Sequence, residues 1–249
     1  MPASADPDAS GVPLRPAVVD FNAPAHEVAR RLIGLTLLVD GVGGRIVETE
    51  AYDQSDPASH TFGGLTARNA AMFGPPGRAY VYRSYGLHWC VNTVCCERGH
   101  GAGVLLRALE PTHGLDTMRQ RRGVQDARLL CAGPGRLAQA LGIDARHNHQ
   151  PLQEPPFALL EPETGLPPSI TVVAGPRIGI SKAVDVPWRF GLQGSRYLSR
   201  GFGAVTPKKK PHRHERCGFC MGACTRCMAP CAARTGYLSS SAASMSQLG

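Results

Sequence analysis

The sequence predicts an α+β fold: a single domain with a curved, mostly antiparallel β-sheet, flanking helices and a protruding β-hairpin. Two observations favour this class. Strand-like segments bounded by glycine and proline turns dominate the middle of the chain. Segments with helical apolar periodicity flank them. Dense apolar patterning runs over residues 16–200, which we expect to be one domain, after a disordered leader (residues 1–15) and before a basic, cysteine-rich tail that we also expect to be disordered (residues 201–249).

The first elements follow from local pattern. The sequence Asn22-Ala-Pro24 begins a predicted helix, because proline suits a first helical turn. Its apolar face is formed by Val28, Ala29, Leu32 and Ile33. Residues 36–39 and 45–51 then read as two strands separated by the turn GVGG.

The remaining elements include a hairpin. Residues 79–82 and 89–94 are predicted strands, and residues 83–88 are the turn between them. Further strands are predicted at 103–109, 170–174 and 177–180, and further helices at 115–122 and 135–141.

Composition limits the function classes. The 27 Lys and Arg residues exceed the 19 Asp and Glu residues, which gives a formal net charge of +8. A field of this sign attracts polyanions, so nucleic acid and anionic membrane both fit. No segment is apolar enough to span a membrane, and the first residues lack the basic and apolar regions of a secretory signal. We therefore expect a cytoplasmic or otherwise intracellular protein (nucleoid if bacterial, nucleus if eukaryotic), whose nine cysteines are thiols or metal ligands rather than disulfides.

The segment RIVETEAYDQSDPASH holds the first candidate site residues. Side chains alternate along a strand, so Glu48, Glu50 and Tyr52 share one face. Two carboxylates and a phenol near His60 could form a catalytic cleft, and a solvent-exposed strand face is an equally valid interpretation.

Aromatic residues gather on the predicted hairpin, AYVYRSYGLHWCVN. Tyr80 and Tyr82 share a face, where packing alone could explain them, but Tyr85 lies at the turn, where packing does not. An aromatic plane beside a cation such as Arg83 suits stacking on an exposed base. In the segment GVLLRALEP, Arg107 lies among leucines, so it either pairs with a core carboxylate or reaches a cleft.

Together these segments resemble the alkyladenine (3-methyladenine) DNA glycosylases of the mammalian type. The resemblance covers residues 29–197 and is carried by several motifs in order: ARRLIG, RIVETEAY with His60 downstream, ARN before MF, GRAYVYRSYGLHWCVN, GVLLRALEP, GLDTMRQ, CAGPGRLAQALGI and PRIGIS. It implies a domain that removes alkylated purines from DNA without a cofactor. It assigns Glu50 as the general base, with Arg107 and the backbone around Ile180 holding the water. It places the flipped base between Tyr52, His60 and Tyr82, with Asn92 lining the pocket to reject guanine and Tyr85 as the wedge that fills the vacated stack.

The chemistry agrees with this assignment. Alkylation places positive charge on the leaving base, and a carboxylate can stabilise an oxocarbenium-like sugar while accepting a proton from water. We expect 3-methyladenine and 7-methylguanine as substrates, with neutral hypoxanthine and ethenoadenine as further candidates. Because no positioned lysine is evident, we expect a monofunctional enzyme that leaves an abasic site. The expected partner is double-stranded DNA containing damaged purines, bound by a monomer.

The tail departs from the family pattern. It contains Cys217, Cys220, Cys224, Cys227 and Cys231, with His212 and His214 nearby. Its two CxxC pairs are closer together than in most zinc modules, so we expect no metal to be needed for the main activity. Two alternatives remain: a non-catalytic damaged-DNA-binding protein, and a metal-binding regulator acting through the tail.

Overall fold

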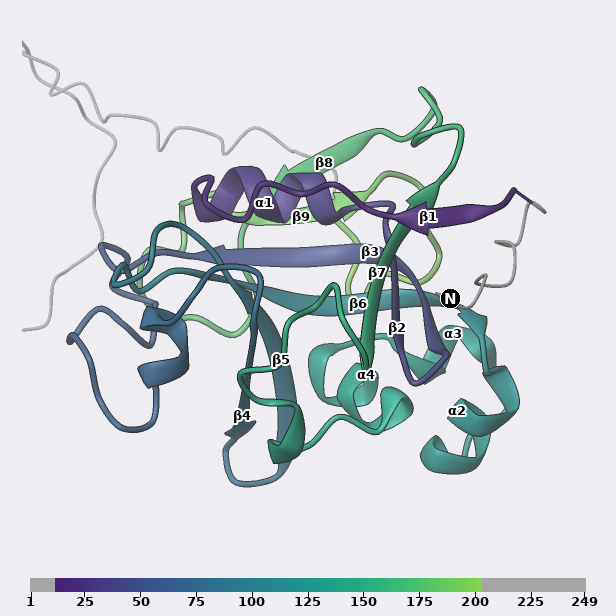
Figure 1. The fold of residues 1–249 in the computed structure, drawn as a ribbon, viewed down its shortest axis with the longest axis horizontal. Coiled ribbons are helices and arrows are strands. Elements are labelled where there is room, and N and C mark those ends of the chain that lie inside the picture. The colour runs from purple at the N-terminus through teal and green to yellow at the C-terminus, as the bar shows by residue number, and fades with distance from the viewer. Residues whose placement is uncertain (1–11, 203–249) are drawn as a thin grey trace, which may run out of the picture. The chain divides into compact units, whose positions relative to one another are not determined.

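The computed structural model describes residues 12–202 (Figure 1). Within this range nine strands form one sheet, and every pairing is antiparallel. The main path has the order β1-β7-β2-β3-β6-β5-β4, and β9 joins β3 to β8. The strands are β1 (Leu14–Pro16), β2 (Thr36–Val39), β3 (Val42–Tyr52), β4 (Ala79–Ser84), β5 (His88–Val94), β6 (Gly103–His113), β7 (Phe157–Pro162), β8 (Val172–Gly175) and β9 (Arg189–Leu192). The predicted α+β class with a mostly antiparallel sheet is confirmed.

Helices flank this sheet. They are α1 (Ala25–Leu32), α2 (Leu115–Arg122), α3 (Ala127–Leu130) and α4 (Pro134–Leu141), with 3-10 turns at Ala70–Phe73 and Ala145–His147. Figure 1 shows α1 on one side of the long β3–β6 pair, and α2 and α4 on the other. The β4–β5 hairpin extends away from the β3–β6 pair in the same view.

Strand β3 is the centre of the sheet. One of its edges pairs with β6 along most of its length. The other edge is shared, because β2 pairs with its first residues and β9 pairs with Glu48–Glu50 further along. The start of β3 needs glycine: a Cβ at Gly43 or Gly44 would lie 1.9 Å from a backbone oxygen of the neighbouring strand. The pairings with β6 and β9 leave neither edge of the segment Glu48–Glu50, which holds the two candidate carboxylates, unpaired.

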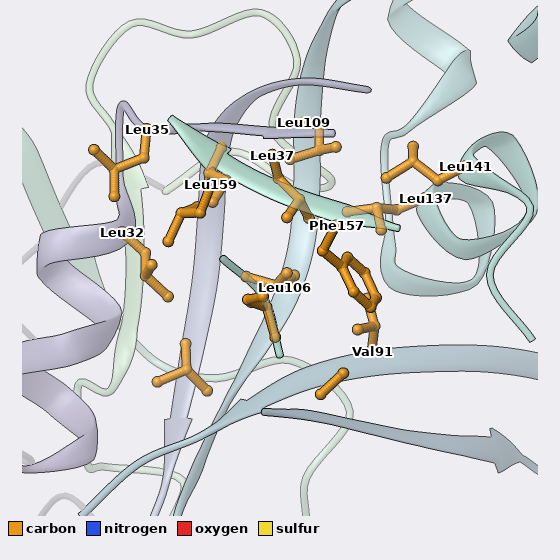
Figure 2. Packing of buried hydrophobic residues seen from close by; sticks show 14 of the residues in the cluster. Leu32, Leu35, Leu37, Val91, Leu106, Leu109, Leu137, Leu141, Phe157 and Leu159 are labelled. Carbon is orange, nitrogen blue, oxygen red and sulfur yellow. The ribbon is translucent and has the colours of Figure 1, made fainter. Parts of the chain in front are cut away.

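The core lies between the sheet and its helices. Helix α1 buries Ala25, Val28, Ala29 and Leu32, so the predicted apolar face is confirmed. On the opposite side, Leu137 and Leu141 of α4 are buried close to Phe157 and Val91 (Figure 2). Leucines of β6 complete this cluster between the helices. The sheet is therefore packed between α1 on one side and α4 on the other.

The structure differs from the sequence-based expectation in several segments. Residues 177–180 are a loop, not a strand, since Gly179 has a φ of +80° and the backbone N–H of Ile178 bonds to a carboxylate instead of a neighbouring strand. Strands β7 and β9 were not predicted. Strand β1 begins at Leu14, within the segment assigned to the leader. Residues 1–11 of that leader, and residues 203–249 of the tail, lie outside the described residues.

Over residues 12–202, no helix has the length and apolar character needed to cross a membrane.

A core substitution should test the support that α4 gives to the sheet. We expect Leu137→Ala to lower the free energy of unfolding by about 2–5 kcal/mol, because its side chain is fully buried and a cavity would remain. Leu129→Ala is the control, since Leu129 is 45% exposed, and it should change stability by about 0.5 kcal/mol or less. Urea unfolding followed by circular dichroism measures both. Equal losses in the two variants would contradict the packing described.

Candidate active site

A cleft of about 510 Å³ opens where the hairpin, the end of β3 and the loop after β8 meet. Its walls come from segments far apart in the sequence. The lining residues are Tyr52, Ala58, His60, Arg68, Met72, Tyr80, Tyr82, Ser84, Tyr85, Cys90, Asn92, Leu105, Arg107, Pro134, Ile178, Gly179 and Ile180. Of the eight residues that the sequence singled out, seven line this cleft, and the eighth, Glu50, bonds directly to three of its lining residues.

Glu50 lies immediately behind the cleft wall and is fully buried. Its Oε2 accepts hydrogen bonds from the Tyr52 hydroxyl at 2.9 Å and from Arg107 Nη1 at 3.2 Å. Its Oε1 accepts one from the backbone N–H of Ile178 at 2.7 Å. A carboxylate offers about four acceptor positions, so these three donors leave room for one more.

The environment of Glu50 makes its carboxyl group a stronger base than usual. Burial raises the pKa of Glu50, because the charged form loses its hydration. Arg107, the Ile178 N–H and the Tyr52 hydroxyl lower the pKa, but burial is the largest effect and the nearby Glu48 charge adds to it, so the net shift of the pKa is upward. The side chain is thus oriented by three donors and still has a raised pKa.

The neighbouring carboxylate, Glu48, has a different role. It is also fully buried, and it accepts bonds from Arg189 Nε at 2.6 Å and Arg107 Nε at 3.3 Å. The backbone N–H and hydroxyl of Ser199 bond to it as well, at 2.6 and 2.9 Å. Glu48 therefore anchors the arginines and does not line the cleft. The interpretation of this strand face as solvent-exposed is wrong for the two carboxylates, because Glu48 and Glu50 are both fully buried.

Arg107 joins the two carboxylates. Its guanidinium contacts Glu48 through Nε and Glu50 through Nη1, and it also lines the cleft. Both interpretations drawn from the sequence therefore apply: the arginine is paired in the core and reaches the site.

The Tyr52 ring also contacts a cation. The guanidinium of Arg177 lies 4.7 Å from the centre of the Tyr52 ring and 5.5 Å from that of Trp188. Arg177 also donates to the Ala51 carbonyl oxygen and forms a buried ion pair with Asp56. Burial raises the pKa of Tyr52, so its hydroxyl remains a donor to Glu50.

Three aromatic rings form another wall. Tyr80 and Tyr82 stack with their centres 5.3 Å apart, and His60 meets the Tyr82 ring edge-on at 4.6 Å. His60 Nδ1 lies 3.2 Å from the Tyr80 hydroxyl. Burial lowers the pKa of His60, which favours the neutral imidazole.

Asn92 lies on the strand next to this wall. It faces Tyr80 in the β4–β5 register, and its Nδ2 donates to the Tyr80 carbonyl oxygen at 3.1 Å. Because Asn92 is buried and its amide is fixed, it gives the cleft a polar group of defined position.

Tyr85 lies at the tip of the hairpin, at the edge of the cleft. It is 91% exposed and has a φ of +50°, and Gly86 beside it has a φ of +69°. The strands of the hairpin are longer than the sequence predicted, so the turn consists only of residues 85–87. The Tyr85 ring is therefore accessible at the mouth of the cleft, where it is available for stacking.

Sequence reasoning missed several residues of this site. Ile180 lines the cleft as expected, but the backbone N–H that reaches Glu50 belongs to Ile178. Arg189 and Ser199, which hold Glu48, were not identified either. The charged residue within the apolar strand RFGL was the one available signal for Arg189. The role of Ile178 could not be predicted in this way, because its backbone N–H makes the contact and every residue type except proline has one.

Comparison with known proteins agrees with the geometry. The family model described as methylpurine-DNA glycosylase matches residues 19–196. A protein of Nitrosospira multiformis is 64% identical over 184 residues, which are 74% of this chain and 93% of the relative. One from Rhodopseudomonas palustris is 62% identical over 196 residues, which are 79% of this chain and 94% of the relative. One from Rhizobium meliloti is 58% identical over 185 residues, which are 74% of this chain and 96% of the relative. All three are provisionally named 3-methyladenine DNA glycosylase.

The family match covers more than half of the chain and includes every residue of the cleft. The chain therefore belongs to the methylpurine-DNA glycosylase family.

Proposed function

We propose that this protein hydrolyses the N-glycosidic bond of alkylated purines in duplex DNA, with Glu50 as the general base. The observation that carries the proposal is a buried carboxylate of raised pKa, fixed by three donors directly behind an aromatic cleft. An N-glycosyl hydrolase needs a base that can activate water beside a planar leaving group, and this arrangement supplies both.

The reaction uses one water molecule. Glu50 accepts a proton from the water through its remaining acceptor position, and the water oxygen bonds to the anomeric carbon of the sugar. The carbon–nitrogen bond breaks, and its electron pair goes to the purine nitrogen, which neutralises the positive charge of an alkylated base. The carboxylate also stabilises the positive charge that develops on the sugar. Arg107, which lines the cleft, orients the carboxylate and helps to hold the water.

The cleft is suited to a single base. Tyr52, His60 and Tyr82 offer ring faces and edges for stacking, and base–aromatic stacking contributes about 1–3 kcal/mol per base. The fixed amide of Asn92 would clash with the amino group of guanine, which supports discrimination against that normal base. Ile180 contributes to the wall beside the water.

A duplex hides the target bond, so the nucleotide must rotate out of the stack at a cost of a few kcal/mol. Tyr85, exposed at the hairpin tip beside the cleft, is placed to fill the gap left behind. Arg68 and Arg83 are exposed on the same side of the structure and can pair with phosphates. We propose that the protein acts as a monomer.

The product should be an abasic site in an uncut strand. None of the described cleft residues is a lysine, so no amine is placed there to form a Schiff base with the sugar. Cationic 3-methyladenine and 7-methylguanine are the proposed substrates. Hypoxanthine and ethenoadenine are less favourable, because a neutral leaving base also needs protonation.

The first functional test removes the base. Glu50→Gln should keep affinity for damaged duplex DNA and lower the single-turnover rate of base release by about 10²–10⁴. Glu110→Gln, which removes a carboxylate paired with Arg45 away from the cleft, is the control and should retain normal activity. Release of 3-methyladenine from methylated DNA, measured by chromatography, is the readout. Excision by Glu50→Gln within a few-fold of wild type would exclude Glu50 as the base.

The second test uses pH. The base works only when ionised, so the rate is full above the pKa of Glu50 and falls as the pH decreases through it. Because burial raises that pKa, the fall in rate on the acid side of the pH–rate profile (the acid limb) should occur at a higher pH than the pKa of an ordinary carboxyl group. Tyr52→Phe removes a hydrogen bond that lowers the pKa, so the acid limb should move to still higher pH. Tyr82→Phe loses the same hydroxyl without touching Glu50, and its acid limb should stay in place. If Tyr52→Phe leaves the midpoint of the acid limb unchanged, the ionisation of Glu50 does not determine that limb.

The third test concerns nucleotide flipping. Tyr85→Ser should weaken the flipped complex by about 1–3 kcal/mol, the contribution of one base–aromatic stack. The loss should be large on intact duplex and small opposite a gap or mismatch, where less stacking is broken. Fluorescence of an ethenoadenine at the lesion reports the flipped fraction, with the exposed Leu129→Ser as control. Equal losses on intact and gapped substrates would mean that Tyr85 does not act as a wedge.

A further inference from the structure

Three side chains that commonly bind metals meet outside the cleft. One ligand atom each from Asp53, Cys96 and His100 lies within 4.8 Å of the other two. The sheet register explains why they meet: Gly103 of β6 pairs with Tyr52 on one side and with Val94 on the other. Asp53 and the loop that follows β5 therefore emerge at the same end of the sheet. None of the three lines the active-site cleft.

The donor set matches one class of cation. A carboxylate oxygen, a thiolate sulfur and an imidazole nitrogen are the ligands of Zn²⁺, which binds three protein groups and leaves its fourth tetrahedral position to water. Zinc binds cysteine as a thiolate, so binding would release the thiol proton that Cys96 Sγ donates to the Ala23 carbonyl oxygen at 3.7 Å.

The surroundings orient these donors. Asp53 Oδ1 accepts two bonds from Ser55, from its N–H at 2.9 Å and its hydroxyl at 2.7 Å, which leaves Oδ2 directed at His100. Such outer contacts are typical of metal sites, where they fix the ligand geometry. The His100 side chain is 39% exposed and that of Asp53 is 21% exposed, so an ion can enter from solvent.

A simple ion pair explains only part of the cluster. Asp53 Oδ2 and His100 Nε2 are 2.7 Å apart, as in an ordinary Asp–His pair. Zinc bonds of about 2.0–2.2 Å to each would require these two atoms to separate slightly. Side chains this exposed can make that adjustment. The pair alone does not account for the Cys96 sulfur, which lies within 4.8 Å of both other ligand atoms.

We propose that Asp53, Cys96 and His100 bind Zn²⁺, with water as the fourth ligand. The ion would join the segment after β3 to the loop between β5 and β6. The segment after β3 also carries His60, and its Gln54 and Thr61 side chains already bond to the backbone of Gly101. Zinc at this point would connect the segment that carries His60 to the loop after β5.

Alkylation of individual cysteines in the full chain tests the proposal directly. The tail has cysteines that can compete for zinc, so total metal content is not a sufficient measure. Instead, the rate of iodoacetamide labelling at Cys96 is followed by peptide mass spectrometry over a series of buffered free Zn²⁺ concentrations. Zinc should slow this labelling at least tenfold in the wild type.

Variants separate a three-ligand site from a single reactive thiol. Asp53→Asn and His100→Gln keep Cys96, so labelling remains measurable, and each should raise the zinc concentration needed for protection by about tenfold or more. His149→Gln, at an exposed histidine far along the sequence, should behave like the wild type. Labelling of Cys96 that zinc does not slow, or protection equal in all four proteins, would overturn the proposal.

Cobalt provides a second readout that does not depend on labelling. In a full-length background with the five tail cysteines changed to serine, Co²⁺ should produce a thiolate charge-transfer band in the near ultraviolet. Cys96→Ser should abolish this band, and Cys131→Ser, at a buried core cysteine, should leave it intact. A band that survives Cys96→Ser, or no band in the parent, would also reject the site.

Discussion

The contact of Arg107 with the two carboxylates of β3 is the interaction on which the rest of the site depends. Two buried acids, Glu48 and Glu50, are balanced by two buried arginines, Arg107 and Arg189. Taking each ion out of water costs several kcal/mol, and this cost is offset only when the geometry is good and the remaining donors and acceptors are satisfied. Ser199 and the N–H of Ile178 supply those further bonds. A network of this kind tolerates little displacement, because losing one partner leaves a buried charge uncompensated, at a cost of about 3–5 kcal/mol.

This network explains why the site needs residues that are distant in the sequence. The carboxylates and Arg107 come from the adjacent strands β3 and β6, but these strands alone would leave one edge of Glu48–Glu50 open to water. Strand β9 pairs with that edge and contributes Arg189, and residues 199–200 cover the arginine. Loop 177–180 then closes the cleft from the side and bonds to Glu50. The C-terminal third of the domain thus contributes to the burial that raises the pKa of Glu50.

Features that depend on local pattern could be predicted from the sequence. The apolar face of α1 and the shared face of Glu48, Glu50 and Tyr52 follow from the repeat of a helix or strand, and the bounds of α2 coincide with the glycines Gly114 and Gly123. Strands β7 and β9 were missed because their partners are remote: Leu160 pairs with Thr36, and Arg189 with Glu50. The burial of Glu50 could not be predicted for the same reason. The alternation of side chains along a strand shows which residues share a face, but it does not show whether another part of the chain covers that face. The aromatic site residues were found through resemblance to a family, and the structure brings them together without testing their roles.

Tyr52 connects recognition of the base with the chemistry proposed for Glu50. Its ring lines the cleft, while its hydroxyl donates to the carboxylate. The raised pKa of the phenol keeps that hydroxyl protonated, and the Arg177 guanidinium, 4.7 Å from the ring centre, restrains the ring. In the function proposed above, a base stacked on Tyr52 would be held at a fixed offset from Glu50. Such positioning matters because a displacement of about 1 Å can cost 10²-fold in rate. The contacts of Arg177 with the Tyr52 and Trp188 rings therefore belong to the proposed catalytic geometry, together with the ion pair of Glu50 and Arg107.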